Sequence, residues 1–334
     1  MGSNGSFWQN KSVLVTGGAG FIGSHVVELL VEAGAHVTVL DSLISGNEAN
    51  LAAVRHQIQL INQDIRTLDW AALLTAHPCA VLFHLAANAY VPPSVETPEY
   101  DYAVNLDSTF RLLSTLRQTK WAGRFVFASS AAVYGNAVQL PITEDDATVP
   151  VSPYGVSKLA AERYVAVFSR LYGLHLASAR FFSAYGPRQK KQVVYDFLEK
   201  LRRNPAELCI HGDGSQVRDF LYVADAARAA LLVAERGSLN GEAYNIGAGA
   251  ACSIAELAAA VCTTVGVQPR FIYSGPNRPG DPEKLTVNIN RLKAIGYDPQ
   301  TTLANGLRHT IEWYNATMAN PEEIRGVPCD ITKP

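Results

Sequence analysis

The sequence predicts an α/β protein: a doubly wound parallel sheet with a smaller, interwoven C-terminal domain. Short apolar runs rich in β-branched residues alternate with helical patterns over the first half of the chain. Strands that are apolar almost throughout are typical of a parallel sheet covered by helices on both faces. Right-handed crossovers then make the doubly wound arrangement the expected topology. Beyond about Gly186 this alternation ends, which indicates a second domain.

The elements of the predicted sheet follow one another closely. The first strand is expected over Lys11–Thr16, and a glycine-rich turn, Gly17–Gly23, leads from it into a helix whose apolar pattern stops at Gly34. Helical stretches separate the later strands. These strands are expected over His36–Leu40, Ile58–Ile61, Ala80–Leu85, Arg124–Ala128 and Leu174–Phe182.

The second half of the chain does not continue the regular alternation of strands and helices. Gly186–Gly214 carries a basic stretch, a helix and a short strand, and Ser274–Pro282 is rich in glycine and proline. Between them lie an alanine-rich helix, Val223–Glu235, and a strand-like run, Ala243–Gly247. We therefore expect one domain from residues 1–182 with about 219–249, and a second from about 183–218 with 250–334.

Composition excludes several classes of protein. The 334 residues are 48% hydrophobic and 17% charged, which argues against disorder, and a net charge of −2 argues against nucleic-acid binding through bulk charge. No apolar run approaches the roughly 18 residues of a membrane span, and the polar start is unlike a signal peptide. Five cysteines without a CxxC spacing predict neither a disulfide framework nor a metal site. We expect a cytoplasmic protein.

The glycine-rich turn predicts a dinucleotide site of the Rossmann type. Gly17, Gly20 and Gly23 follow a predicted strand and open a predicted helix, so the backbone can approach a pyrophosphate at the helix N-terminus. Asp41 ends the second strand, where a carboxylate can accept hydrogen bonds from the adenosine ribose hydroxyls and repel a 2′-phosphate. The pattern favours NAD over NADP; a loop turn and a strand-end cap are the structural alternatives.

Three further segments follow strand ends or face the same edge. Asp64, after the third strand, is explained equally well by an adenine contact or by a turn. Leu85–Ala87 ends the fourth strand with small residues, which lets a flat ring lie close. Asn105 lies in a helical stretch and either reaches the cofactor or faces solvent, and both readings stay open.

A tyrosine and a lysine four residues apart, Tyr154 and Lys158, share one face of a helix that starts after Pro153. The ammonium, joined by the positive nicotinamide ring, is expected to lower the pKa of the phenol from about 10 toward neutrality. Tyr154 then acts as a general base. Ser129 and Ser130 follow a buried strand and so lie at the same sheet edge as the glycine turn. Taken alone, the tyrosine–lysine pair would be a solvated helix face.

Several motifs together resemble the extended short-chain dehydrogenase/reductase family. They are TGGAGFIGSH from Thr16, Asp41, HLAA from His84, SSAAVYG from Ser129, SPYGVSK from Ser152 and RDF from Arg218. Within that family the chain is similar to nucleotide-sugar 4-epimerases of the UDP-galactose 4-epimerase type. The likeness runs from about Lys11 to Trp313.

The resemblance implies a role for each matching residue. Tyr154 would be the base, Lys158 its electrostatic partner and ribose ligand, and Ser130 the hydroxyl between Tyr154 and substrate O4, with Ser129 as support. Substrate would also contact Ser183, where most members have Asn, as well as Arg218, Arg278 and Asp281, which grip the diphosphate and ribose. The implied cofactor-binding set is Gly17, Gly20, Phe21, Ile22, Gly23, Asp41, Asp64, Ile65, Leu85, Ala86, Ala87, Asn105, Ser129, Tyr154, Lys158 and Phe181.

The implied reaction is NAD-dependent epimerisation at C4 of a nucleotide-diphosphate sugar through a transient 4-keto sugar. A 4,6-dehydratase or a decarboxylase would need acidic residues where Ala131 and Ala132 stand. A 4-ketosugar reductase stays as the alternative, although Asp41 disfavours its usual NADPH, and a non-catalytic NAD-sensing scaffold is the alternative from another class. A homodimer is expected through the helices near Asp101–Leu116 and Ser157–Leu171. The sugar is left open.

Overall fold

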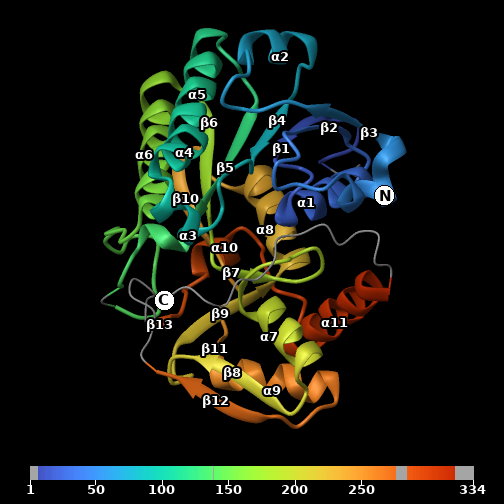
Figure 1. Ribbon diagram of the computed structural model, residues 1–334. Helices are drawn as coiled ribbons and strands as arrows, with labels where there is room; N and C mark the ends of the chain where they lie inside the picture. The colour runs from blue at the N-terminus through green and yellow to red at the C-terminus, as the bar shows by residue number, and fades with distance from the viewer. Residues whose placement is uncertain (1–6, 138, 276–283, 320–334) are drawn as a thin grey trace, which may run out of the picture.

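The computed structural model describes residues 7–137, 139–275 and 284–319. Two parts lie one above the other, a larger one built on a broad sheet and a smaller one built on short strands (Figure 1). Within the described ranges, no helix is both long enough and apolar enough to cross a membrane.

The larger part contains a seven-stranded sheet in the order β10-β6-β5-β4-β1-β2-β3, and every neighbouring pair is parallel. The order 3-2-1-4-5-6 is that of a doubly wound nucleotide-binding sheet, so the expected fold class is confirmed. The strands are β1 (Ser12–Thr16), β2 (His36–Asp41), β3 (Ile58–Asn62), β4 (Val81–His84), β5 (Arg124–Ser130), β6 (His175–Phe181) and β10 (Asn240–Ile246).

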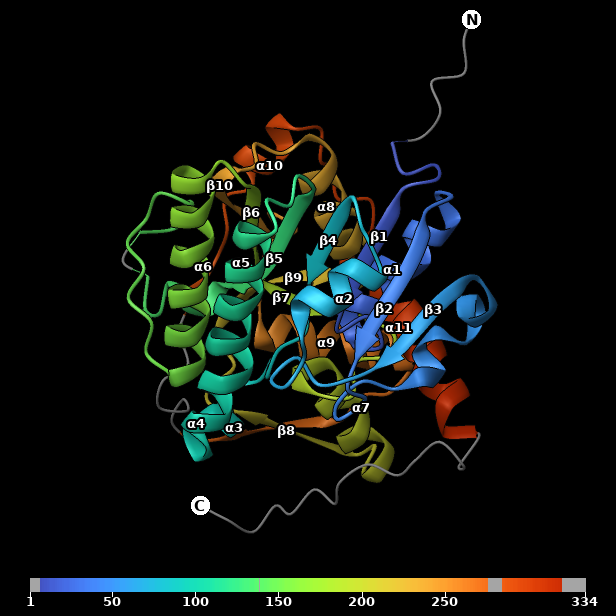
Figure 2. The same ribbon diagram turned by 90° about the horizontal axis from the view of Figure 1, so that it is seen from above.

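Helices cover both faces of this sheet (Figure 2). One core packs α1 and α8 on one face, and another packs α2, α5 and α6 on the other. This two-sided cover explains why the strands read as apolar runs. The elements are α1 (Phe21–Glu32), a 3₁₀ stretch (Glu48–Gln57), α2 (Trp70–Ala76), α5 (Ser108–Gln118), a 3₁₀ turn (Ala131–Val133), α6 (Pro153–Tyr172) and α8 (Val223–Arg236).

Helix α6 has clear start and stop signals in the sequence. Ser152 caps it by accepting a hydrogen bond from the Gly155 N–H at 3.2 Å, and Pro153 occupies the first turn. Gly173 ends it in the left-handed conformation at φ 66°. Before α5 the chain forms three short helical segments in succession. They are α3 (Val91–Glu96), α4 (Pro98–Asp101) and a π-helical stretch (Tyr102–Asp107).

The smaller part is organised around β9, which pairs with β7 and β13 in parallel and with β11 in antiparallel orientation. A separate parallel pair joins β8 to β12, and α7, α9 and α11 contribute to the core of this part. The elements are β7 (Ser183–Tyr185), α7 (Gln192–Arg203), β8 (Glu207–His211), β9 (Val217–Tyr222), β11 (Ala251–Ser253), α9 (Ile254–Val265), β12 (Arg270–Ser274), β13 (Lys284–Leu285) and α11 (Leu303–Ala319). Helix α10 (Asn290–Ala294) follows β13 but packs against β10, with Leu292 in the core of the large sheet.

The chain crosses between the two parts more than once. After β7 it stays in the smaller part through β9, returns to the large sheet with α8 and β10, and then leaves again at β11. The expected return at about residue 219 falls inside β9, which pairs only with strands of the smaller sheet. We propose that the domain division follows the sheets, with the return placed after Tyr222.

Candidate active site

The glycine turn lies between β1 and α1 at the carboxyl edge of the large sheet. A Cβ atom on Gly17, whose φ is 71°, would lie 2.6 Å from the Ala86 nitrogen, and one on Gly23 would lie 2.0 Å from the Gly17 carbonyl oxygen. Side chains are therefore excluded from both positions. A Cβ on Gly20 would meet only the Gly17 carbonyl oxygen within 4 Å, so that side of the turn is open. No side chain caps α1 at Gly20, which leaves room for a phosphate at its N-terminus.

Asp41 ends β2 beside this turn, as predicted, but its carboxylate also has a structural task. One oxygen accepts the Ala19 N–H at 2.9 Å and the other accepts the Leu43 N–H at 2.9 Å. Burial raises the pKa of Asp41, and the two backbone hydrogen bonds oppose that shift. Gly46 lies so close that a Cβ there would be 2.6 Å from a carboxylate oxygen. The Asp41 carboxylate thus holds the glycine turn in place. Its remaining lone pairs can still accept hydrogen bonds from hydroxyl groups.

The other predicted cofactor contacts differ in where their side chains lie. Asp64 forms a bidentate ion pair with Arg66, with oxygen–nitrogen distances down to 2.6 Å, and this pairing lowers the pKa of Asp64. Ile65 is buried in the core under α2 and α5. Phe21 and Ile22 form the half-buried first turn of α1, while three half-buried residues directly follow β4: Leu85, Ala86 and Ala87.

Asn105 does not face solvent, so the solvent-facing alternative for this residue is wrong. Its side chain is buried in the π-helical stretch, where its oxygen accepts the Asn88 N–H at 2.9 Å. Its amide nitrogen donates to the Asn88 carbonyl, the Asp101 carboxylate and the Ser157 hydroxyl at 2.9 to 3.2 Å. Asn105 therefore fixes the loop after β4. The sequence gives no signal for these partners because they lie on other segments.

Tyr154, Lys158 and Ser130 come together at the carboxyl end of β5. The Ser130 hydroxyl is hydrogen-bonded to the Tyr154 phenol, and Tyr154 and Lys158 lie one turn apart on α6 with exposed fractions of 9% and 2%. The Lys158 ammonium donates to the Ala128 carbonyl at 2.9 Å and lies 4.9 Å from the centroid of the Phe127 ring. The structure thus gathers a phenol, a hydroxyl and an ammonium in a buried place at the expected edge.

The expected acidification of Tyr154 is not found in the chain by itself. Burial raises the pKa of Tyr154 to about 12, and the hydrogen bond from Ser130 opposes this only in part. Burial also lowers the pKa of Lys158 to about 8. The prediction counted the attraction of the lysine charge and of the nicotinamide ring, and it omitted the cost of burying the phenolate. A positive group at this site is therefore needed to ionise Tyr154 near neutral pH.

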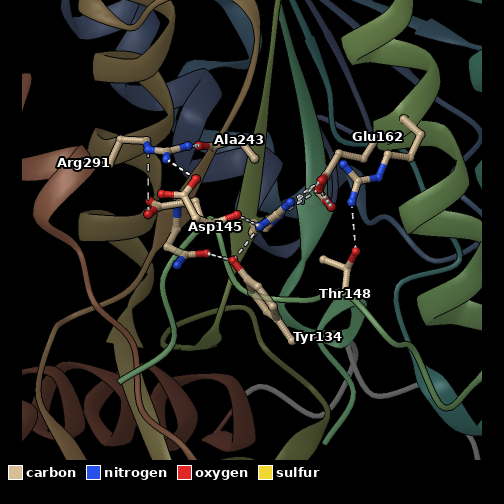
Figure 3. Close-up of polar contacts among 11 residues, drawn as sticks. Tyr134, Asp145, Thr148, Glu162, Ala243 and Arg291 are labelled. Carbon is tan, nitrogen blue, oxygen red and sulfur yellow. Dashed lines mark hydrogen bonds and ion pairs between the residues drawn. The ribbon is translucent and has the colours of Figure 1, made fainter. Parts of the chain in front are cut away.

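Ser129 has a different partner from the one expected. Its hydroxyl donates to Glu162 at 2.6 Å, and Glu162 forms a buried ion pair with Arg180 of β6 at 2.5 Å. Arg180 also donates to the Tyr134 hydroxyl at 2.6 Å, and Tyr134 in turn donates to the Asn245 side chain at 2.7 Å. Figure 3 shows Tyr134 and Glu162 converging on one guanidinium group. This network ties α6 to β5, β6 and β10.

The same network extends to α10, which packs against β10. Glu144 accepts the Asn245 N–H at 2.8 Å, and Arg291 of α10 lies 3.8 Å from the Glu144 carboxylate. Arg291 also bonds Asp145 at 2.8 Å and the Ala243 carbonyl at 3.1 Å, as Figure 3 shows. The sequence analysis missed all of these residues. The one available signal was the position of Glu162, a further four residues past Lys158 on the same helix face.

The predicted substrate contacts lie where the two parts meet. Phe181 ends β6 next to Ser130 in the sheet, and Ser183 begins β7 next to Phe220 of β9. Arg218 is half-buried on β9 and donates to the Val217 carbonyl at 2.9 Å. Two other predicted contacts, Arg278 and Asp281, lie outside the described residues.

Known proteins resemble this chain over nearly its whole length. A model of the NAD dependent epimerase/dehydratase family matches residues 13–247. The chain is 36% identical over 306 residues to a putative UDP-glucose 4-epimerase from Methanocaldococcus jannaschii, covering 90% of this chain and 97% of the relative.

Solved structures show the same likeness. UDP-glucose 4-epimerase from Thermotoga maritima, solved with UDP-glucose, is 36% identical with a TM-score of 0.85, and the match covers 92% of this chain and 99% of that one. UDP-N-acetylglucosamine 4-epimerase from Methanobrevibacter ruminantium, solved with UDP-N-acetylmuramic acid, is 32% identical with a TM-score of 0.86, covering 93% and 100%.

Proposed function

The chain belongs to the NAD dependent epimerase/dehydratase family, and from that premise we propose that it inverts C4 of a UDP-sugar through a transient 4-keto intermediate. One observation carries the proposal. Tyr154 and Lys158 are buried, and the half-buried Ser130 contacts Tyr154, at the sheet edge that also holds the glycine turn. The two residues after Ser130, Ala131 and Ala132, have no side chain that transfers a proton.

The residues around the glycine turn fit the cofactor NAD. The open side of Gly20 and the uncapped start of α1 would hold the pyrophosphate, and Asp41 would accept the adenosine ribose hydroxyls. A 2′-phosphate would meet the Asp41 carboxylate, so NADP is disfavoured. When bound, NAD supplies a hydride acceptor that also returns the hydride to the sugar.

The chain's own residues move the proton of the sugar O4 hydroxyl. Ionised Tyr154 accepts this proton through or alongside Ser130 as C4 is oxidised, so the sugar gains a C4 carbonyl. Lys158 stabilises the phenolate by its charge. The keto sugar then rotates in the site and presents the other face of C4. As C4 is reduced on that face, Tyr154 returns the proton to the sugar O4. The reaction therefore leaves both the residues and the sugar composition unchanged.

The surroundings of Ser130 favour epimerisation over elimination. Loss of water across C5 and C6 requires an acid and a base close to the keto sugar, and decarboxylation by relatives uses an acidic residue as well. In this chain Ala131–Val133 form a 3₁₀ turn directly after Ser130, and the Ser130 hydroxyl caps that turn by accepting the Ala132 N–H at 3.2 Å. This turn keeps Ser130 at the site, and neither Ala131 nor Ala132 supplies an acid or a base, which supports epimerisation.

The UDP part of the substrate is proposed from the relatives, whose structures were solved with UDP-sugars. Arg218 would pair with the diphosphate, together with Arg278, and Asp281 would contact the nucleotide ribose. Ser183 would face the sugar from the start of β7. A serine there is shorter than the usual asparagine, so the sugar has more room on this side.

We also propose a homodimer built on α5 and α6. These helices lie side by side at one edge of the molecule (Figure 2), and their outer face is apolar. Phe110 of α5 packs edge-on against Tyr164 of α6 at 4.9 Å, and Val167 and Leu171 are 46% and 69% exposed. A contiguous exposed apolar face of this kind is typical of a protein interface.

The proposed reaction is tested with four sugars and no added reductant. Purified protein is incubated with UDP-glucose, UDP-galactose and their N-acetyl forms, and products are identified by NMR. We expect inversion at C4 of at least one sugar. Tyr154→Phe should lose about 10²–10⁴-fold in turnover while still binding NAD, whereas Tyr164→Phe on the outer face of α6 should stay active. Unchanged turnover in Tyr154→Phe, or no inversion of any sugar by NAD-loaded protein, would contradict the proposal.

A further inference from the structure

A buried carboxylate outside the predicted site lies close to the reacting residues. Asp101 ends α4 and is 1% exposed. Its carboxylate accepts hydrogen bonds from the Ser157 hydroxyl at 2.6 Å, the Asn105 amide at 2.9 Å and the Asn88 amide at 3.1 Å. All three donors are neutral. Burying a carboxylate among neutral groups is costly, and these three hydrogen bonds offset part of that cost.

The three donors come from three segments around the active site. Asn88 lies in the loop after β4, next to the small residues at the sheet edge, and Asn105 lies one helical turn beyond Asp101. Ser157 directly precedes Lys158 on α6. The chain between Asp101 and α5 is π-helical, a widened turn that is frequent at functional sites. This wide turn brings the Asn105 side chain to the same carboxylate.

The charge of Asp101 acts on both titrating residues of the site. It raises the pKa of Lys158, against the stronger lowering by burial, and it raises the pKa of Tyr154. Two other titratable groups near Lys158, His84 and Glu162, carry no unpaired negative charge. Burial lowers the pKa of His84 on β4 to about 3, which keeps it neutral, and Glu162, one turn further along α6, is paired with Arg180.

We propose that Asp101 is a positioning residue whose carboxylate, held by Ser157, Asn105 and Asn88, is the buried counter-charge of the Lys158 ammonium and fixes the loop after β4 against α6. The structural part of this inference is independent of the proposed function. Only the expected effect of Asp101 on turnover rests on the proposed function. In the ligand-free protein, Asp101 keeps Lys158 charged in a place where burial favours the neutral amine. It therefore sets the upper pH at which Lys158 can assist Tyr154.

The first test needs no turnover. Lysine labelled with ¹³C at Cε is followed by NMR across pH in the ligand-free full-length protein, and the Lys158 signal is identified by its loss in Lys158→Arg. In Asp101→Asn the midpoint of the Lys158 titration should fall by about one pH unit or more, the range for loss of a nearby opposite charge. Asp101→Ser, a smaller neutral replacement, should shift the midpoint in the same direction.

Two matched variants separate charge from hydrogen bonding. Asp107→Asn removes the same charge from the same helical stretch, at a half-buried position, and should leave the midpoint unchanged. Ser157→Ala keeps the carboxylate and removes one of its donors, so its midpoint should stay closer to that of the unaltered protein than the midpoint of Asp101→Asn does. An Asp101→Asn midpoint equal to that of the unaltered protein would overturn the inference.

The second test links the charge to catalysis. The alkaline limb of kcat/KM for C4 inversion should move to lower pH in Asp101→Asn by the same interval as the NMR midpoint. A uniform loss of kcat/KM at every pH, with the limb unmoved, would show a structural role alone and overturn the inference. If the unaltered protein inverts no UDP-sugar, the proposed function fails, while the NMR midpoint still decides the role of Asp101.

Discussion

Helix α6 carries a row of buried polar side chains on its inner face and exposed apolar side chains on its outer face. On the inner face Tyr154, Lys158 and Glu162 follow one another at intervals of four residues, and all three are buried. On the outer face Val167 and Leu171 are apolar and about half or more exposed. One helix therefore buries polar groups and exposes apolar ones along its length.

The difference lies in the partners that each face has within the chain. On the inner face Ser130 hydrogen-bonds to Tyr154, the Ala128 carbonyl accepts from Lys158, and Arg180 pairs with Glu162. Burial of polar groups is tolerable because each has a hydrogen-bond partner. The outer face packs against the neighbouring helix α5, and among the residues that the structure describes nothing covers its remaining apolar surface. The inner face is thus suited to chemistry and the outer face to association.

Removing the charge from the inner face should have the largest effect. Lys158→Met keeps the apolar stem of the side chain but leaves Tyr154 without its ammonium neighbour, so the phenol stays protonated at neutral pH. We expect turnover to fall by about 10²–10⁴-fold, measured as kcat for C4 inversion. Lys200→Met on α7, whose lysine forms a partly exposed ion pair with Asp196, is the control and should keep its turnover. A loss below tenfold in Lys158→Met would contradict the role of the ammonium.

Breaking the ion pair between Glu162 and Arg180 should lower the free energy of unfolding rather than the turnover. Arg180→Met leaves the buried Glu162 carboxylate without its cation, and we expect the free energy of unfolding to fall by about 3–5 kcal/mol, measured by urea denaturation. Replacing both residues by apolar ones should recover much of this loss. Arg55→Met breaks the exposed pair with Glu48 and should cost about 0–1 kcal/mol. Equal losses for the buried and exposed pairs would contradict the proposed difference.

On the inner face of α6 the sequence predicts the pair Tyr154 and Lys158 but not the ion pair of Glu162, and the reason is physical. Tyr154 and Lys158 are four residues apart, so helix periodicity alone brings them together. Glu162 fits the same spacing, but its partner Arg180 comes from a neighbouring strand, and nothing in the sequence around either residue indicates the pair. Asp101 is missed in the same way, since its three donors belong to separate segments.

Strand and helix positions are predicted more fully than the electrostatics. Apolar runs and turn residues locate six strands of the large sheet to within two residues, because two-sided burial imposes that pattern, while β10 begins three residues before the predicted run. In the chain by itself burial raises the pKa of Tyr154, an effect that depends on the completed fold and is not visible in the sequence. The domain boundary near residue 219 stays a prediction, and the sequence could not show the long-range pairing of β9 with β7 that places it differently from the strands of the large sheet.

Charging the outer face should have the smallest effect on each chain and the clearest effect on assembly. Val167→Asp with Leu171→Asp places two carboxylates on surface that is already exposed, so the folding free energy of one chain should change by only about 0.5 kcal/mol per site. A dimer that buries this face would have to desolvate both charges, and light scattering after size exclusion should show a monomer. Tyr273→Asp on β12 of the smaller part, which charges an equally exposed apolar position away from α5 and α6, is the control and should stay dimeric. If the unaltered protein is already monomeric at micromolar concentration, the apolar face is not a dimer interface, and the contrast between the two faces of α6 must have another cause.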